Sequence, residues 1–454
     1  MEETKSATKD LTVGSPMKLI LGFAFPMFLG LLLQQCYTLI DTMIVGKYLG
    51  VEPFAGVGST GSLSFITIGF CIGVCSGFAV PVAQKFGAKD EKGLRKMVAN
   101  SIWLCVILGG AFTLLMLVFC KQILNLMHTP DNIYRYAFIY IFILFAGIPC
   151  TMLYNMTASI IRALGDSKSP ILFLAISSVM NIGLDFLLIV GLHMNVEGAA
   201  LATVISQGVS GIICVIYMKK KFAILKMQKG DMQMDIKAMK TLFGIGIPMG
   251  LQYSITGIGS VILQSSVNNL GYIYVASMTA AGRINGFLMC PLDALGQSMA
   301  PYAGQNIGAK KIDRVGKGLG AAILLGCIVS VVMLFVSYFF GGSLARLFLD
   351  EENQEIMKLC AQFLRIVSYF FCLLTLVNTV RFTIQGMGFS TFAILAGVLE
   401  MIARGVAGVV LVPAFGFVGA CFSSPLAWLM ADLFLVPAFF YCTKRVRKTM
   451  EAGC

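Results

Sequence analysis

The feature that most constrains this chain is a series of twelve long apolar runs. Each is long enough to cross a bilayer as a helix, since about 20 apolar residues suffice. The runs are continuous rather than alternating, which excludes a transmembrane β-barrel. Their approximate limits are 18–47, 54–84, 98–120, 134–161, 169–192, 197–218, 241–268, 273–305, 318–345, 359–386, 389–413 and 417–442. The sequence therefore predicts an all-α polytopic membrane protein with twelve transmembrane helices.

Composition agrees with this prediction. Of the 454 residues, 57% are hydrophobic and 12% are charged, whereas soluble domains carry about 25% charged residues. A soluble enzyme is therefore excluded, and membrane lipid is the expected surrounding. The net charge of +12 does not indicate a nucleic-acid partner, because basic residues gather in loops beside membrane spans.

The distribution of Lys and Arg predicts the orientation. The two termini and the loops after even-numbered runs hold 25 basic residues, and the loops after odd-numbered runs hold five. Positively charged loops stay in the cytoplasm, so both termini are expected there. No removable signal peptide is expected, and the predicted location is a bacterial inner (plasma) membrane.

Short motifs recur at a spacing of 221 to 223 residues, which indicates an internal duplication. The pairs are Gly22-x-x-x-Pro26-Met27 with Gly244-x-x-x-Pro248-Met249, Gln84-x-x-Gly87-Ala88-Lys89 with Gln305-x-x-Gly308-Ala309-Lys310, Asn155, Gly165 and Ser167 with Asn378, Gly388 and Ser390, and Gly198-Ala199 with Gly419-Ala420. We expect an N-lobe at 1–218 (helices 1–6), a basic cytoplasmic linker at 219–240 and a C-lobe at 241–454 (helices 7–12). Two duplicated six-helix lobes are typical of a transporter, with substrate bound between repeats.

The energy source is not ATP, because no G-x-x-x-x-G-K-[ST] motif is present. Transport against a gradient would then use an ion, which requires ionisable groups within the membrane. No cofactor is expected, and the expected coupling ion is H⁺ or Na⁺. A metal centre is not expected, since the chain has two histidines and no C-x-x-C pair.

Polar residues of the first half are expected to meet at one depth. Asp41 lies ~23 residues into a helix that starts in the cytoplasm, and Asp185 lies ~16 residues into another, so at about 1.5 Å per residue both reach the outer half of the bilayer. Tyr37 and Asn181 each precede one of them by one turn, and Thr203 lies at a similar depth. Two carboxylates in a poorly solvated site either hold a proton or bind a cation. The alternative is a structural hydrogen-bond cluster.

The second half carries a different set of charges within its runs. Glu400 and Arg404 are spaced to pair along one helix face. The other candidates are Arg283, Asp293, Arg381 and Asp432, with Gln385 and Trp428 as polar and aromatic neighbours. These groups form either internal ion pairs or a charged wall of a substrate cavity, and the sequence leaves both open.

Several of these motifs, in this order, resemble the multidrug and toxic compound extrusion (MATE) family over nearly the whole chain. They are Gln34-Gln35-x-Tyr37-x-x-x-Asp41-x-x-x-Val45-Gly46, the two Gln-x-x-Gly-Ala motifs, and Arg162-Ala163-Leu164-Gly165-Asp166-Ser167. Asn181-x-x-x-Asp185 together with Asp41 is similar to the DinF-like branch. The resemblance implies two lobes that exchange H⁺ or Na⁺ for amphipathic, often cationic, compounds.

The resemblance also implies roles for individual residues. Tyr37, Asp41, Asn181, Asp185, Thr203 and the carbonyl of Ala199 would form the cation site. Pro26 would be the point at which the first helix bends, since proline removes a backbone hydrogen bond. The chain departs from the NorM-type branch, which carries acids on the seventh and tenth helices. Thr256 stands at the expected position on the seventh helix, and the tenth run has no acid, which argues against a C-lobe cation site.

The function expected from the sequence is a cation-coupled antiporter that exports amphipathic, mainly cationic, small molecules by alternating access. The arginines of the second half keep an anionic or zwitterionic substrate open. They also keep open a flippase for a lipid-linked sugar. An integral membrane enzyme is a weaker alternative, because no nucleophile, base and metal ligands converge. A monomer is expected, and the substrate itself is not encoded in a recognisable motif.

Overall fold

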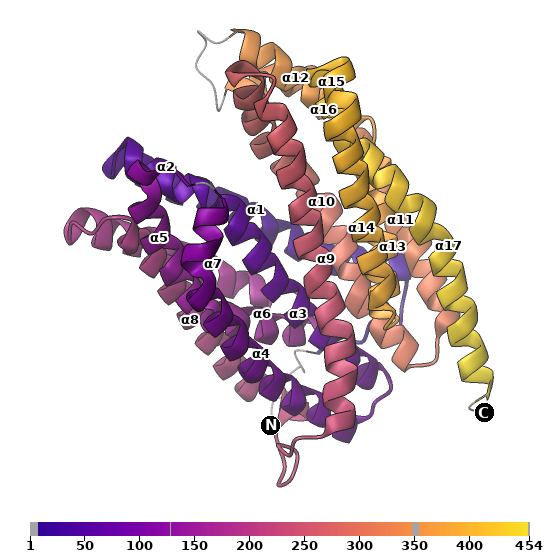
Figure 1. The fold of residues 1–454 in the computed structure, drawn as a ribbon. Helices are drawn as coiled ribbons and strands as arrows, with labels where there is room; N and C mark the ends of the chain where they lie inside the picture. The colour runs from indigo at the N-terminus through magenta and orange to yellow at the C-terminus, as the bar shows by residue number, and fades with distance from the viewer. Residues whose placement is uncertain (1–7, 128, 347–353, 453–454) are drawn as a thin grey trace. The chain divides into compact units, whose positions relative to one another are not determined.

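The computed structural model describes residues 8–127, 129–346 and 354–452, which form helices and connecting turns without any strand. The first half contains α1 (Pro16–Tyr48), α2 (Val51–Ser59), α3 (Gly61–Gly87), α4 (Glu91–Leu126), α5 (Asp131–Ala146), α6 (Ile148–Ala163), α7 (Ser169–Asp185), the π-helix η1 (Phe186–Gly191), α8 (Val196–Lys221) and the 3₁₀ turn η2 (Ala223–Leu225). The second half contains α9 (Ile236–Asn268), α10 (Tyr272–Gly308), α11 (Ile312–Arg346), α12 (Gln354–Ser368), α13 (Phe371–Gly386), α14 (Ser390–Val406), the π-helix η3 (Ala407–Leu411), α15 (Val412–Phe415), α16 (Phe417–Cys421) and α17 (Ser423–Ala452). Figure 1 shows these helices in sequence colours.

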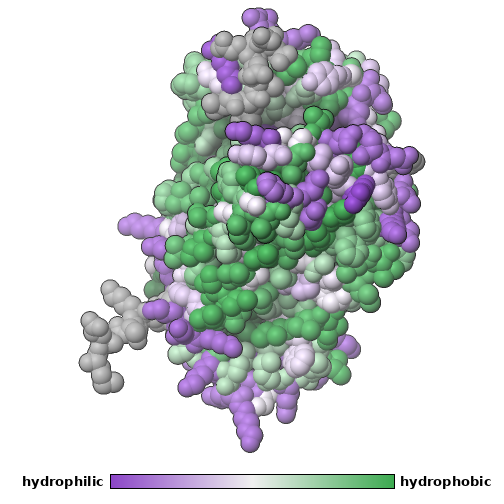
Figure 2. Space-filling view, turned by 90° about the vertical axis from the view of Figure 1, so that its left-hand side faces the viewer, coloured by the Kyte–Doolittle hydropathy of each residue, from purple (hydrophilic) through white to green (hydrophobic). Residues whose placement is uncertain are grey.

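The twelve predicted runs each coincide with a helix or a helix pair. Nine helices in the described ranges are long and apolar enough to span a membrane, and two bent pairs raise the number to 11. The remaining run, 273–305, is α10, whose 37 residues suffice in length but which is not among the helices that are apolar enough by this criterion. On the face drawn in Figure 2, hydrophobic residues form a broad band, and hydrophilic residues gather mainly toward its ends. The all-α polytopic fold predicted from the sequence is confirmed.

The bent pairs have a local cause in the first half. The chain bends by 46° between α5 and α6, where Pro149 lies in the first turn of α6. Proline has no N–H to donate and is favoured at the start of a helix. The second pair, α12 and α13, bends by 53° without a proline at the break. The same bend thus recurs in both halves on different residues.

Backbone features repeat at the spacing found in the sequence. Lys89 and Lys310 adopt positive φ angles of 56° and 57°, values that non-glycine residues rarely take. The π-helices η1 and η3 begin 221 residues apart, at Phe186 and Ala407. The duplication therefore extends to unusual backbone geometry, which a chance match of motifs would not produce.

Two compact units emerge from the contacts, and the first helix of each half contributes to both of them. Unit 1 contains residues 1–10 and Leu29–Gly250, and unit 2 contains Leu11–Phe28 and Leu251–Cys454. α1 therefore passes from unit 2 to unit 1 after Phe28, and α9 passes from unit 1 to unit 2 after Gly250. The division predicted from the sequence, at 1–218, 219–240 and 241–454, follows the repeated motifs, whereas the two units follow contacts between residues. The predicted division stays a prediction.

Hydrogen bonds hold the two stretches that precede these crossings, which we call leading segments (Leu11–Phe28 and residues 228–250). In unit 2, the Leu11 N–H donates to Gln305 Oε1 over 2.8 Å, and Arg314 donates to the carbonyl of Gly14 over 2.9 Å. In unit 1, the Asp235 N–H donates to Asn100 Oδ1 over 2.9 Å. Arg95 pairs with Asp231 over 2.8 Å. Each leading segment is thus bound by residues of the opposite half of the sequence.

Candidate functional site

Unit 1 contains the first polar cluster, which we call the unit 1 cluster: Tyr37, Asp41, Asn181, Asp185 and Thr203. Tyr37 and Asp41 lie one turn apart on the part of α1 that belongs to unit 1. Asn181 and Asp185 lie one turn apart on α7, and Thr203 lies on α8. Asn181 and Asp185 are 3% and 0% exposed, so their polar groups are removed from solvent.

Several contacts bring these residues together. The carboxyl groups of Asp41 and Asp185 interact electrostatically with each other, and Asp41 also interacts with Tyr37. A cavity of about 50 Å³ is lined by Tyr37, Asn181 and Thr203. Further polar residues line the same cavity: Gln34, Asn155, Ser177, Ser178, Ser206 and Gln207. The Thr203 hydroxyl donates to the carbonyl of Ala199 over 3.2 Å.

The carboxylates of this cluster lack partners. In the part of the chain that the structure describes, Asp41 Oδ1 and both oxygens of Asp185 accept no hydrogen bond, and neither acid forms an ion pair. The Asn181 amide is likewise unsatisfied. A buried ionised carboxylate without a partner is strongly unfavourable. Proton binding or coordination of a small cation would remove this cost.

Local backbone structure places Asp185 at a special point. α7 ends at Asp185, and the π-helix η1 begins at the next residue. A π-helical turn inserts extra backbone into a helix and often occurs at functional sites. Pro26 lies inside α1, two residues before the crossing at Phe28. Its role as a bend point stays a prediction.

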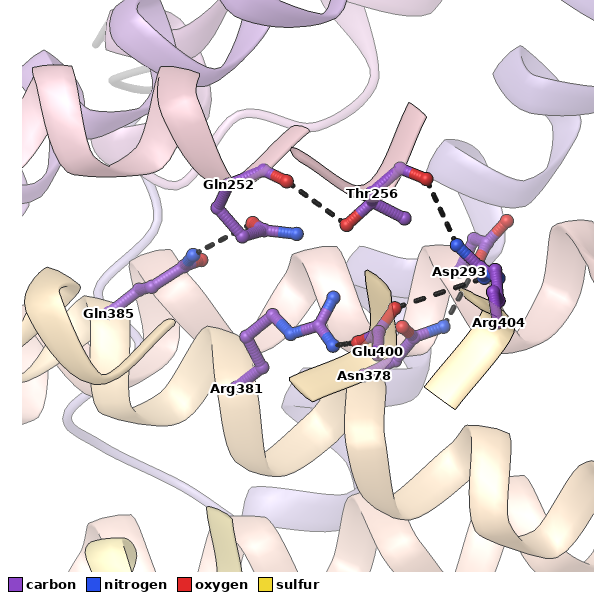
Figure 3. Close-up of polar contacts among 8 residues, drawn as sticks. All are labelled: Gln252, Thr256, Asp293, Asn378, Arg381, Gln385, Glu400 and Arg404. Carbon is purple, nitrogen blue, oxygen red and sulfur yellow. Dashed lines mark hydrogen bonds and ion pairs between the residues drawn. The ribbon is translucent and has the colours of Figure 1, made fainter. Parts of the chain in front are cut away.

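Unit 2 contains the second polar cluster, the unit 2 cluster: Asp293, Arg381, Glu400, Arg404 and Asp432. Glu400 on α14 forms an ion pair with Arg381 of α13, and its other oxygen lies 3.9 Å from Arg404. Figure 3 shows Glu400 between the two guanidinium groups. Arg404 also donates to the carbonyl of Thr256 over 3.0 Å. All three charged residues of this network are at most 9% exposed.

The remaining predicted residues of the second half are placed as follows. Asn378 donates to Asp293 over 2.8 Å, and Gln385 donates to Gln252 over 3.4 Å (Figure 3). Arg283 is exposed and forms no ion pair within the described ranges. The structure therefore gathers Asp293, Arg381, Gln385, Glu400 and Arg404 around α13 and leaves Arg283 apart.

The two clusters differ in what they could hold. No group of three His, Cys, Asp or Glu side chains in the described residues is arranged to bind a metal ion. The unit 1 cluster offers carboxylate, amide, hydroxyl and carbonyl oxygens, the hard donors that a proton or an alkali cation prefers. In the unit 2 cluster, Arg381 and Arg404 stand beside the acids, and positive charge there disfavours a metal cation.

Sequence reasoning missed two neighbours of the unit 1 cluster. Tyr140 on α5 is 9% exposed and interacts electrostatically with Asp41 and Asp185. Its neighbours in sequence are aromatic and aliphatic, so nothing distinguished it from packing residues. Gln207 was identifiable as a polar residue one turn after Thr203. Its Oε1 is buried and lacks a hydrogen-bond partner among the described residues.

Comparisons with known proteins agree with this architecture. The MatE family model matches residues 26–187 and 248–411, one match in each half. The chain is 30% identical over 373 residues to the probable multidrug resistance protein YoeA of Bacillus subtilis, covering 81% of this chain and 80% of that protein. It is 23% identical over 344 residues to a FAD transporter of Shewanella oneidensis, covering 74% and 75%.

A solved structure shares the fold. It is an outward-facing multidrug resistance MATE family transporter of the MOP superfamily, with a TM-score of 0.89, 23% identity and 99% of each chain covered. Because the family model covers most of the chain in two matches and a curated relative covers four fifths of it, the resemblance suggested by the sequence motifs is confirmed. The chain belongs to the MatE (MATE) family of multidrug efflux transporters, membrane proteins that carry small molecules and are not enzymes.

Proposed function

We propose that this protein is an antiporter that exports amphipathic, mainly cationic, small molecules in exchange for H⁺ or Na⁺. The observation that carries the proposal is the unit 1 cluster, where the buried Asp185 interacts with the half-buried Asp41. Among the described residues, both oxygens of Asp185 and Oδ1 of Asp41 lack a hydrogen-bond partner, and neither acid has a basic partner. Such a pair favours uptake of a cation. Coupling follows if the ion and the substrate favour opposite states of the transporter.

Each member of the site has a part in this cycle. Asp41 and Asp185 would hold the coupling ion, while Asn181, Thr203 and the Ala199 carbonyl would offer neutral oxygens to it. Tyr37 interacts with Asp41 and lines the cavity beside Asn181. Pro26 would allow α1 to bend when the charge of Asp41 changes, since its missing N–H weakens the helix there. The protein would act as a monomer by alternating access, in a bacterial plasma membrane with both termini in the cytoplasm.

The unit 2 cluster bears on the substrate. Arg381 and Arg404 both engage Glu400, and Arg381 also interacts with Asp293 and Asp432, so acids of the cluster compensate their charge. This supports a cationic or neutral substrate over a lipid-linked pyrophosphate, whose flippase would need uncompensated basic groups. The relative named as a FAD transporter keeps an anionic substrate among the compounds to assay. Arg283, which is exposed and outside this network, is the basic residue most open to such a ligand.

The test is uptake of a fluorescent organic cation into inverted membrane vesicles under a separately imposed pH or Na⁺ gradient. We expect one gradient to drive uptake by the wild type, and Asp41→Asn and Asp185→Asn to reduce it to the level of vesicles without the protein. Arg447→Gln, which alters an exposed ion pair with Asp313, serves as a matched control and should transport normally. Equal gradient-driven uptake in all variants would overturn the proposed site. Uptake of no organic cation, with movement of a lipid-linked sugar instead, would favour the flippase.

A further inference from the structure

Asp432 is a buried acid that the unit 1 mechanism does not use. It lies on α17, is 6% exposed, and neither of its carboxyl oxygens has a hydrogen-bond partner in the described parts of the chain. The residues beside it on α17, Ala431 and Leu435, are fully buried and apolar. An acid in such surroundings must be neutralised, either by a neighbouring charge or by a proton.

The charged groups on the helices around α17 can be assigned one by one. α13 contributes Arg381, which interacts electrostatically with Asp432 but forms its ion pair with Glu400. α14 contributes Glu400 and Arg404, which pair with each other and with Arg381 or Thr256. In the part of the chain described, α11, α16 and η3 also pack against α17 or its neighbours, and none of them places an ionisable group against Asp432.

Counting charge in the unit 2 cluster leaves one carboxyl in excess. Two guanidinium groups, Arg381 and Arg404, face three acids. Glu400 is compensated by both arginines. Asp293 accepts the amide hydrogen bond of Asn378, which stabilises its ionised form. Asp432 has no donor, so it is the acid for which ionisation is least favourable.

We propose that Asp432 is a proton-binding site, so that the second half carries an exchangeable proton on residues unrelated by the repeat to those of the first half. The Arg381 guanidinium interacts with this carboxyl and would repel Na⁺. The same guanidinium favours the ionised carboxylate, so the observation that favours a proton is burial of Asp432 without any hydrogen-bond donor among the described residues. A sodium ion would also need several oxygen ligands. One proton on Asp432 makes the unit 2 cluster formally neutral.

Protonation of Asp432 does not depend on the antiport proposed above. A role of this proton in the transport cycle, however, rests on that proposed function. The two ideas can fail separately. A wild type that transports no organic cation would refute the antiporter and leave the proton at Asp432 untouched. Absence of the proton would leave a transporter coupled through unit 1 alone.

The experiment is infrared spectroscopy of the full-length protein, purified and returned to lipid. Protonated carboxylic acids have a carbonyl stretching band that shifts in D₂O and disappears on ionisation. To remove the unit 1 acids from the spectrum, the background variant carries Asp41→Asn and Asp185→Asn. We compare it with the same background bearing Asp432→Asn, and with a control bearing Asp313→Asn, which alters an exposed acid outside the unit 2 cluster. Unfolding temperature and elution volume establish that each variant is folded.

In the background variant at neutral pH we expect one D₂O-sensitive carboxylic acid band, which Asp432→Asn removes and Asp313→Asn retains. The band should vanish reversibly as the pH is raised. An unchanged spectrum in the Asp432→Asn variant, or loss of the band in the Asp313→Asn variant, would overturn the proposal. If Asp432→Asn does not fold, Asp432→Glu replaces it. A shifted band then supports the site, and an unshifted band refutes it.

Discussion

The two halves of this transporter share a backbone plan but place their buried charges at different positions. Counted along the repeat, Asp41 corresponds to Leu263, which is 5% exposed within an apolar cluster. Asp185 corresponds to Val406, the residue before the π-helix η3. The second half keeps the π-helix and the bent helix pair and lacks both acids, so conserved geometry in a duplicated fold does not preserve chemistry.

The two clusters also differ in whether a positive charge compensates their acids. Glu400 meets two guanidinium groups, whereas Asp41 and Asp185 face each other without a cation from the described residues. Breaking a compensated buried pair exposes an unbalanced charge, but neutralising an uncompensated acid removes one. The halves should therefore respond to the same kind of substitution with effects of different sign.

The largest stability effect is expected for Glu400→Gln. This substitution leaves Arg381 and Arg404 buried with their common partner gone, which typically costs about 3–5 kcal/mol. Thermal unfolding of the purified protein should show a clearly lowered midpoint. A midpoint equal to that of the wild type would mean that the two arginines find other partners, and the contrast between the halves would lose its basis.

Arg404→Gln should have a smaller effect than Glu400→Gln. Arg404 approaches Glu400 only to 3.9 Å, and its hydrogen bond to the Thr256 carbonyl measures 3.0 Å. Loss of one charge-assisted hydrogen bond costs about 1.5–3 kcal/mol. The same unfolding assay ranks the variants, and an Arg404→Gln protein less stable than Glu400→Gln would reverse our assignment of Glu400 as the common partner.

Asp185→Asn should abolish coupled transport without lowering stability. No donor or basic group stabilises its carboxylate among the described residues, so the amide loses no favourable partner. A matched control in the same unit is Asp166→Asn. Asp166 accepts hydrogen bonds from Lys168, Ser169 and Tyr217, and its substitution should lower the unfolding midpoint. If Asp185→Asn destabilises the protein as much as Asp166→Asn, the unit 1 cluster is structural.

The smallest expected effect is a pH-dependent change in how easily a protease cleaves the second leading segment. The pKa of Asp235 is held below its ordinary value, first by the hydrogen bond from Lys96 and then by the Ala238 N–H. Its contribution is therefore complete above the ordinary aspartate value of about 4 and is lost as the pH falls through the lowered value. Proteolysis at residues 228–235 should increase at acidic pH, and Asp235→Asn should remove this dependence.

The first leading segment provides the internal comparison for that experiment. It is held through its main-chain groups by the amide side chains of Gln305 and Asn306 and the guanidinium of Arg314, without a carboxyl group among them. Cleavage near Leu11 should consequently show no matching acid-dependent rise. An equal rise at both segments would indicate general loosening of the fold.

Much of this architecture could be predicted because hydrophobicity and repetition are local properties of a sequence. The twelve runs, the polytopic fold and the repeat follow from apolar length and motif spacing. The crossing of α1 and α9 between units was not predictable, because it depends on contacts between residues nearly 300 positions apart, such as Leu11 and Gln305.

The two candidate sites also differ in how far the sequence alone could predict them. Asp41 and Asp185 were identifiable because ionisable residues are rare within apolar runs. The partners of Arg381 and Asp432 were not, since helix rotation decides which of several acids a guanidinium meets. Tyr140 gave no signal at all, because a tyrosine among aromatic and aliphatic residues is most often packing.

The exchange of leading segments also shapes how the protein must be made. Residues Leu11–Phe28 leave the ribosome early, yet Gln305 and Arg314, which bind this stretch, are synthesised nearly 300 residues later. During that interval the beginning of the nascent chain waits without its partners, and unit 1 stays incomplete until Gly250 has been added. The contacts that hold Leu11–Phe28 in unit 2 can therefore form only after most of the chain has been translated.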